Sequence, residues 1–118
     1  MSNIPYLIIN DLAGMLDAAP QDSITSRTVY KDDHLKVILF VFAEGQSLSE
    51  HTAAVPAIIH ILAGEATIEL GGTSHPAQAG TWIHMQAQVP HGITARTPLT
   101  MLLTMLQQRV EAPGTSEA

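Results

Sequence analysis

Residues 58–72 read IIHILAGEATIELGG, and this stretch contains two strand patterns separated by a glycine. Apart from His60, the residues from Ala57 to Ala63 are apolar and several are β-branched, and Thr67-Ile68-Glu69-Leu70 then alternates polar and apolar side chains. The alternation ends at Gly71-Gly72, a pair of residues typical of a two-residue hairpin turn. The stretch therefore predicts two short strands, the second of which enters a hairpin.

Similar strand patterns extend along the chain in both directions. Upstream, Thr28-Val29-Tyr30 and residues 35–43 are rich in β-branched and aromatic side chains. Downstream, three more short segments lie between glycine and proline turns, at residues 81–85, 91–95 and 99–106. No helix long enough for a parallel crossover fits between these segments. We therefore predict an all-β sandwich or barrel.

The two ends of the chain have different patterns. One face of a short helix fits the spacing of Leu7, Ile8, Leu12, Met15 and Leu16, with the helix ending at Ala19-Pro20. Small and polar residues predominate after residue 110, which predicts a disordered tail. We therefore predict an N-terminal arm over residues 1–26, packed on or beside the barrel, a barrel over residues 27–110, and a tail over residues 111–118.

The composition limits the partners. Eleven Asp and Glu residues oppose five Lys and Arg, which gives a net charge of −6 and argues against nucleic-acid binding. Apolar residues make up 46% of the chain and charged residues only 14%, so we expect a homodimer that buries part of the surface. No cysteine is present, so any metal would be bound by histidine, carboxylate, amide or water.

No targeting or membrane segment is evident. The amino terminus lacks the cationic start and the small-residue cleavage site of a signal peptide. The longest apolar run, residues 37–43, is far shorter than the ~18 residues that span a bilayer. We therefore expect a cytoplasmic protein that has no membrane partner.

Four of the six histidines lie in or beside the central predicted strands: His51, His60, His84 and His91. Histidine is the commonest metal ligand in proteins, and β-barrels build metal sites from imidazoles that converge from several strands. The spacing of these four residues contains no i, i+2 pair, so ordinary packed histidines are the alternative.

Two segments resemble the motifs of the cupin family. Residues 45–51, GQSLSEH, with residues 57–64 resemble the first motif, and residues 80–91, GTWIHMQAQVPH, resemble the second. The family's motif positions are matched by Gly45, His51, Gly64, Gly80 and His91. The resemblance covers residues 35–106 and is to small single-domain cupins of the RmlC-like, cupin_2 type. It implies a cupin-type jelly-roll β-barrel, here with a short N-terminal helical segment and a degenerate first metal motif.

The resemblance also implies a metal site, of which His51 and His91 would be ligands. The family's second histidine falls on Ala53 and its glutamate on Ala57. Catalytic metal sites use about three protein ligands, so a bound ion would need His60 or His84 as well. Strand alternation argues against His60, because it should point away from the face that carries Ala57. The alternative for His60 and His84 is a polar contact on the outer face, in a dimer interface.

Two functions remain open for this pocket. One is a metal-dependent dioxygenase or lyase that uses a divalent ion (Fe, Mn, Ni or Zn) and acts on a small organic substrate. The other is a non-catalytic module that binds or senses a small ligand without a metal. A barrel that only dimerises is a third possibility. Whether the protein is an enzyme is left open, and the residues expected to line the pocket are Ala53, Ala57, Ile59, Ile61 and Gln86.

Overall fold

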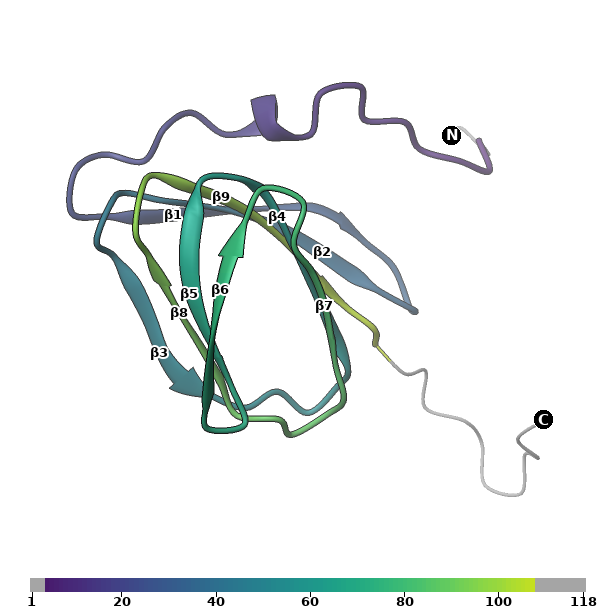
Figure 1. The fold of residues 1–118 in the computed structure, drawn as a ribbon. Coiled ribbons are helices and arrows are strands. Elements are labelled where there is room, and N and C mark those ends of the chain that lie inside the picture. The colour runs from purple at the N-terminus through teal and green to yellow at the C-terminus, as the bar shows by residue number, and fades with distance from the viewer. Residues whose placement is uncertain (1–3, 108–118) are drawn as a thin grey trace, which may run out of the picture.

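The computed structural model describes residues 4–107, which form nine strands and one 3-10 turn. The strands are β1 (Ile24–Lys31), β2 (Lys36–Phe42), β3 (Ser47–His51), β4 (Ala57–Ala63), β5 (Glu65–Leu70), β6 (Thr73–Gln78), β7 (Trp82–Met85), β8 (His91–Ala95) and β9 (Leu99–Met105). They form a five-stranded sheet in the order β1-β2-β9-β4-β7 and a four-stranded sheet in the order β3-β8-β5-β6. The two sheets face each other, as Figure 1 shows. The predicted all-β cupin-type jelly roll is confirmed.

The core lies between the sheets because inward side chains are apolar on both. In β4, Ala57, Ile59 and Ile61 are buried, while the alternate residues are only half-buried. From the facing sheet, Ile68 and Ile93 pack into the same cluster. Each large apolar side chain that is removed from water stabilises the fold by about 1.5–3 kcal/mol, so this alternation holds the two sheets together.

The hairpin predicted at Gly71-Gly72 is present. Both glycines have positive φ angles, 55° and 88°, as a type I′ turn requires, and Leu70 pairs directly with Thr73. The strand that follows, β6, contains Pro76 and lies at the edge of its sheet. Edge strands tolerate proline because its missing N–H need not serve a neighbouring strand.

The predicted short N-terminal helical segment is only a 3-10 turn, at Ala13–Met15, in the described part of the arm. The Gly14 N–H donates to the carboxylate of Asp11 (3.2 Å), and the Met15 N–H donates to the Leu12 carbonyl (3.2 Å). Glycine is a poor helix former, and so short a segment gains too little to nucleate a helix. No described helix is long and apolar enough to cross a membrane.

The rest of the arm runs across the outer side of β1 and β2 (Figure 1). The Arg27 guanidinium donates to the Met15 carbonyl (3.0 Å), which ties the arm to β1. Leu39 and Val41 point away from the barrel interior and are nevertheless buried, and Val41 lines a pocket together with arm residues such as Leu16. Strand β1 begins at Ile24, slightly before the predicted start of the barrel at residue 27. The predicted tail, residues 111–118, lies outside the described residues.

Candidate functional site

Two histidines that are distant in the sequence meet on the four-stranded sheet. His51 on β3 and His91 on β8 are direct partners in the antiparallel register, and their ring centroids lie 4.2 Å apart with an angle of 57° between the rings. Gly92 lets β3 approach this closely, because a Cβ at this position would lie 3.2 Å from the Glu50 nitrogen and from the Leu48 carbonyl oxygen. The pair is therefore fixed by strand pairing.

Backbone carbonyls determine which ring nitrogen of each histidine carries the proton. Nδ1 of His91 lies 2.8 Å from the Val89 carbonyl oxygen, and Nδ1 of His51 lies 3.0 Å from the Ser49 carbonyl oxygen. A carbonyl can only accept, so each Nδ1 is the N–H donor. A neutral imidazole then has its lone pair on Nε2. The pair thus offers two Nε2 atoms that can accept hydrogen bonds or bind a cation.

Below the pair lies a small apolar cavity of about 60 Å³. This volume corresponds to about two water molecules. His91 is 8% exposed and His51 is exposed, so the pair reaches from the interior of the barrel to solvent. The cavity is lined by Phe40, Leu48, His51, Ile59, His91, Gly92, Ile93, Met101 and Leu103.

Only one of the five predicted lining residues, Ile59, contacts this cavity. Ala57 and Ile61 point inward but are packed in the core elsewhere along β4. Ala53 and Gln86 lie in the connections after β3 and after β7, away from the cavity lining. The cavity is also lined by residues from β2 and β9, such as Phe40 and Met101, that were not predicted, since alternation alone does not show which face of a fully apolar strand turns inward.

The family of the chain follows from its sequence together with this fold. The family model Cupin_2, described as a cupin domain, matches residues 38–105, which is more than half of the chain. The chain belongs to the Cupin_2 family. No protein among the curated sequences matches this cupin.

Solved structures agree with the family. A cupin superfamily protein from Desulfitobacterium hafniense is 25% identical with a TM-score of 0.79, over 91% of this cupin and 97% of that chain. A conserved protein of unknown function from Streptococcus pyogenes is 28% identical with a TM-score of 0.78, over 92% of this cupin and 95% of that chain. An RmlC-like cupin from Desulfovibrio desulfuricans is 25% identical with a TM-score of 0.73, over 86% of this cupin and 97% of that chain. This cupin is therefore similar to these three solved structures over almost their whole length.

His60 and His84 are not brought to the histidine pair of this cupin. His60 pairs with Trp82, and His84 pairs with Ile58, so both histidines lie on the face of the sheet opposite the core residues Ala57 and Ile59. The outer-face arrangement is the one observed. The other two histidines, in the β1–β2 turn and on the edge strand β6, are not part of the cavity lining either.

The donor set does not fit a firmly bound divalent ion. Within residues 4–107, no group of three or more histidines, aspartates or glutamates is placed to hold a metal ion. Two of the family's ligand positions carry Ala53 and Ala57, and methyl groups cannot coordinate a cation. One chain of this cupin therefore offers two imidazoles where metal centres of the zinc or iron type use about three protein ligands.

Proposed function

We propose that this cupin binds a small organic molecule at the His51–His91 pair as a non-catalytic binding or sensing module that needs no resident metal. The observation that supports it is the pair of Nε2 acceptors beside an apolar cavity, each oriented by a backbone carbonyl. Two neighbouring acceptors favour a ligand that carries hydrogen-bond donors, such as hydroxyl groups, next to an apolar part.

The size of the cavity limits how such a ligand binds. About 60 Å³ takes only a few non-hydrogen atoms, so the ligand's apolar end enters the cavity and its polar end lies at the exposed His51. Two hydrogen bonds contribute about 0.5–1.5 kcal/mol each, and the apolar end contributes about 0.8 kcal/mol per buried methylene. For two or three buried methylenes these contributions sum to about 3–5 kcal/mol, which supports a weak affinity with a dissociation constant of about a millimolar.

A metal-dependent dioxygenase or lyase is the second candidate. It is favoured by the Nδ1–carbonyl hydrogen bonds, because metal-binding histidines almost always donate their other ring N–H in this way. The number of ligands argues against it, since the two imidazoles stand without the third donor that such a centre needs. No carboxylate of the described chain lines the cavity to act as a general base.

Elemental analysis and calorimetry separate the two candidates. Protein purified without a histidine tag is analysed for Fe, Mn, Ni and Zn, and is titrated with phenol and with small diols. We expect substoichiometric metal and saturable binding of at least one probe, which His51→Ala and His91→Ala abolish. His75→Ala is the matched control, because His75 is exposed on β6 and should leave binding unchanged. Stoichiometric metal that disappears in the double variant would overturn the metal-free proposal and support the second candidate.

A further inference from the structure

We propose that a polar groove at one end of the four-stranded sheet binds a small zwitterion of the α-amino acid class. The groove lies where β5 begins and where β6 and β8 end, and its volume is about 330 Å³. Pockets for small molecules have volumes of about 300–1,000 Å³. The groove shares no lining residue with the cavity at the His51–His91 pair. It is lined by Glu65, Pro76, Ala77, Gln78, Thr81 and Arg96.

Two opposite charges come to this groove from neighbouring strands. Ala66 pairs with Ala95, and both are buried in the core. Since side chains alternate along a strand, Glu65 and Arg96, one position further, point to the opposite side of the sheet. The Arg96 N–H donates to the Glu65 carbonyl (2.9 Å), which holds the two backbones side by side. One carboxylate and one guanidinium therefore line the same groove.

Neither charge is paired in the structure. Oppositely charged side chains on neighbouring strands commonly interact, yet within residues 4–107 the Glu65 carboxylate and the Arg96 guanidinium make no ion pair or hydrogen bond. Among the described residues, Arg96 is also the only lysine or arginine in or directly beside this sheet. The two charges are therefore free to bind separate groups of one ligand.

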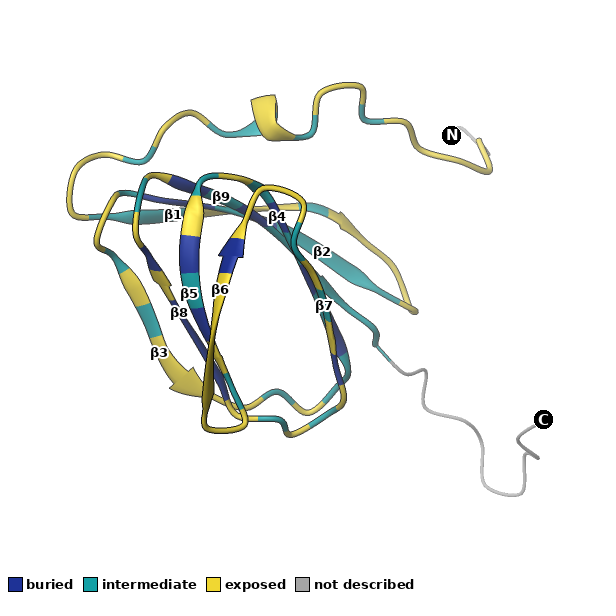
Figure 2. Cartoon of the chain, in the orientation of Figure 1, coloured by how far each residue is buried: buried dark blue, intermediate teal, exposed yellow. Residues whose placement is uncertain are grey.

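The backbone around the groove is held by hydrogen bonds. The hydroxyl of Thr97 accepts from the Glu65 N–H (2.9 Å), and the hydroxyl of Thr81 accepts from the Gln78 N–H (3.0 Å). The Thr81 N–H donates in turn to the Gln78 carbonyl (2.9 Å). Figure 2 shows β6 as exposed apart from the position of Ala77, so the groove opens to solvent. Because the backbone is already fixed, binding needs to order only side chains and ligand.

The charges select the chemistry of the ligand. The Arg96 guanidinium can donate two parallel hydrogen bonds to a carboxylate. The ionised Glu65 side chain can only accept, so it suits an ammonium group. A ligand with one charge alone would satisfy one of these groups and be repelled by the other. Since one water molecule takes about 30 Å³, the groove has room for about ten non-hydrogen atoms, the size of a small amino acid.

The test is an NMR titration of the whole ¹⁵N-labelled chain with L-alanine. We expect saturable shifts of the backbone amides of Gln78, Thr81 and Arg96, with a dissociation constant of about 1–10 mM because both charges lie at the surface. Propionate lacks the ammonium group and ethylammonium lacks the carboxylate, so each should bind at least about 10-fold more weakly. The amides of His51 and His91 should not shift, which separates this site from the proposed binding at the histidine pair.

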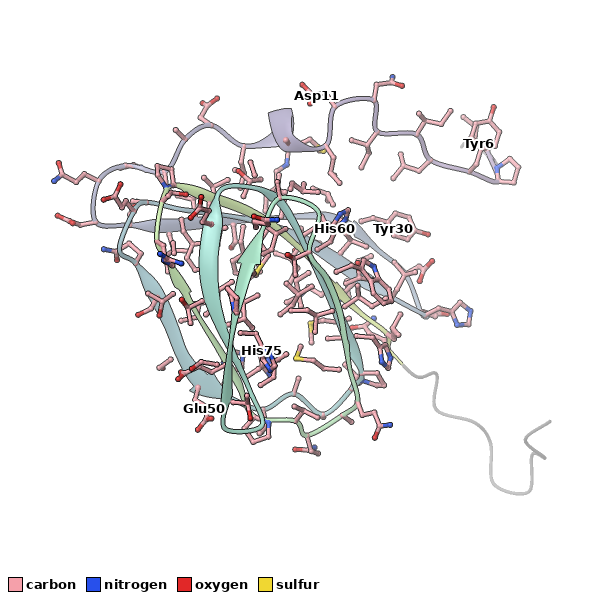
Figure 3. The ribbon with its side chains drawn as sticks, in the orientation of Figure 1. Tyr6, Asp11, Tyr30, Glu50, His60 and His75 are labelled. Carbon is pink, nitrogen blue, oxygen red and sulfur yellow. The ribbon has the colours of Figure 1, made fainter. Side chains whose placement is uncertain are left out.

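Charge-removing variants identify the groups that bind. Arg96→Gln and Glu65→Gln should each raise the dissociation constant for L-alanine at least about 10-fold. Both keep the backbone hydrogen bonds of the groove, and circular dichroism verifies that the strands remain. Lys31→Gln and Glu50→Gln are the matched controls, because they make the same charge changes elsewhere. Lys31 lies on the other sheet, and Figure 3 shows Glu50 at the opposite end of the barrel from the end of β6.

Three outcomes would overturn the proposal. The first is that the amides of the groove do not shift at ten times the expected dissociation constant, as would happen if Glu65 and Arg96 paired with each other in solution. The second is that propionate or ethylammonium binds as tightly as L-alanine. The third is that Lys31→Gln or Glu50→Gln weakens binding as much as the corresponding variant in the groove does.

Discussion

At the scale of single residues, Gly64 is the position where the fold leaves no room for a side chain. Its φ angle is +92°, and a Cβ would overlap the carbonyl oxygen of Pro98. We expect Gly64→Ala to lower the free energy of unfolding by about 2–4 kcal/mol, because the backbone strain and the overlap add. Gly45 has a similar φ of +84° but nothing within 4 Å, so Gly45→Ala should cost only about 1–2 kcal/mol. Urea unfolding measures both, and equal losses would show that the overlap is relieved at no cost.

Two threonines give opposite expectations for the same change. The buried hydroxyl of Thr25 has no hydrogen-bond partner, so Thr25→Val should be neutral or should stabilise by up to about 1 kcal/mol. The Thr97 hydroxyl accepts from the Glu65 N–H (2.9 Å) and donates to the Pro98 carbonyl (3.1 Å). Thr97→Val should therefore cost about 1–2 kcal/mol in the same urea assay. A loss of stability in Thr25→Val would mean that its hydroxyl has a partner in solution.

At the scale of elements, the β1–β2 turn is organised by one carboxylate. The Tyr30 hydroxyl donates to Asp32 (2.6 Å), and the backbone N–H groups of His34 and Leu35 donate to the same side chain (2.7 and 2.9 Å). These bonds hold the pKa of Asp32 below its usual value. The pKa of Tyr30 is raised, first by its hydrogen bond to Asp32 and then by loss of hydration and the negative charge of Asp32.

This turn gives a prediction on both sides of neutral pH. The stabilisation by Asp32 should be present above its unfolded pKa of about 3.9 and be lost as the pH falls through the lower folded pKa. The stabilisation by Tyr30 should be present below about pH 10 and be lost as the pH rises through its higher folded pKa. Both effects are small because the groups are exposed, so NMR titration of the Asp32 carboxyl is the measurement. Tyr30→Phe should raise that pKa toward the ordinary value, whereas an unchanged pKa would rule out the hydrogen bond in solution.

The elements also show how far the sequence could predict the structure. Strand β4 has the predicted bounds, Ala57–Ala63, because a run of apolar residues that ends at Gly64 has a clear local signal. Strand β3 was not predicted, since four of its five residues are exposed and mostly polar. Strand β6 was not predicted either, because Pro76 is typical of a turn, and only the edge position makes it tolerable.

The candidate site could likewise be predicted only in part from local sequence patterns. The likeness to the cupin motifs singled out His51 and His91, and strand register brings these two side chains together. The part of the cavity lining that Phe40 and Met101 form could not be predicted, because these residues come from strands far apart in the sequence that become neighbours only through the topology. Local patterns find a strand, but they do not say which strand lies beside it.

At the scale of the whole molecule, the topology predicts slow folding. Strand β2 pairs with β9, and β3 pairs with β8, so the central contacts of both sheets join residues far apart in the chain. Such long-range pairing must close large loops before it gains contacts. We expect refolding in about milliseconds to seconds, measured by stopped-flow circular dichroism. Complete refolding within microseconds would contradict this reading of the topology.

The place of β9 between β2 and β4 has a consequence for synthesis on the ribosome. Residues 36–42 and 57–63 leave the exit tunnel well before residues 99–105, yet they cannot join one sheet until the later strand pairs with both of them. The growing chain therefore carries two apolar strands with unpaired edges until β9 has been made, and such edges invite pairing with other chains. Emergence of the last strand is the event that closes the barrel.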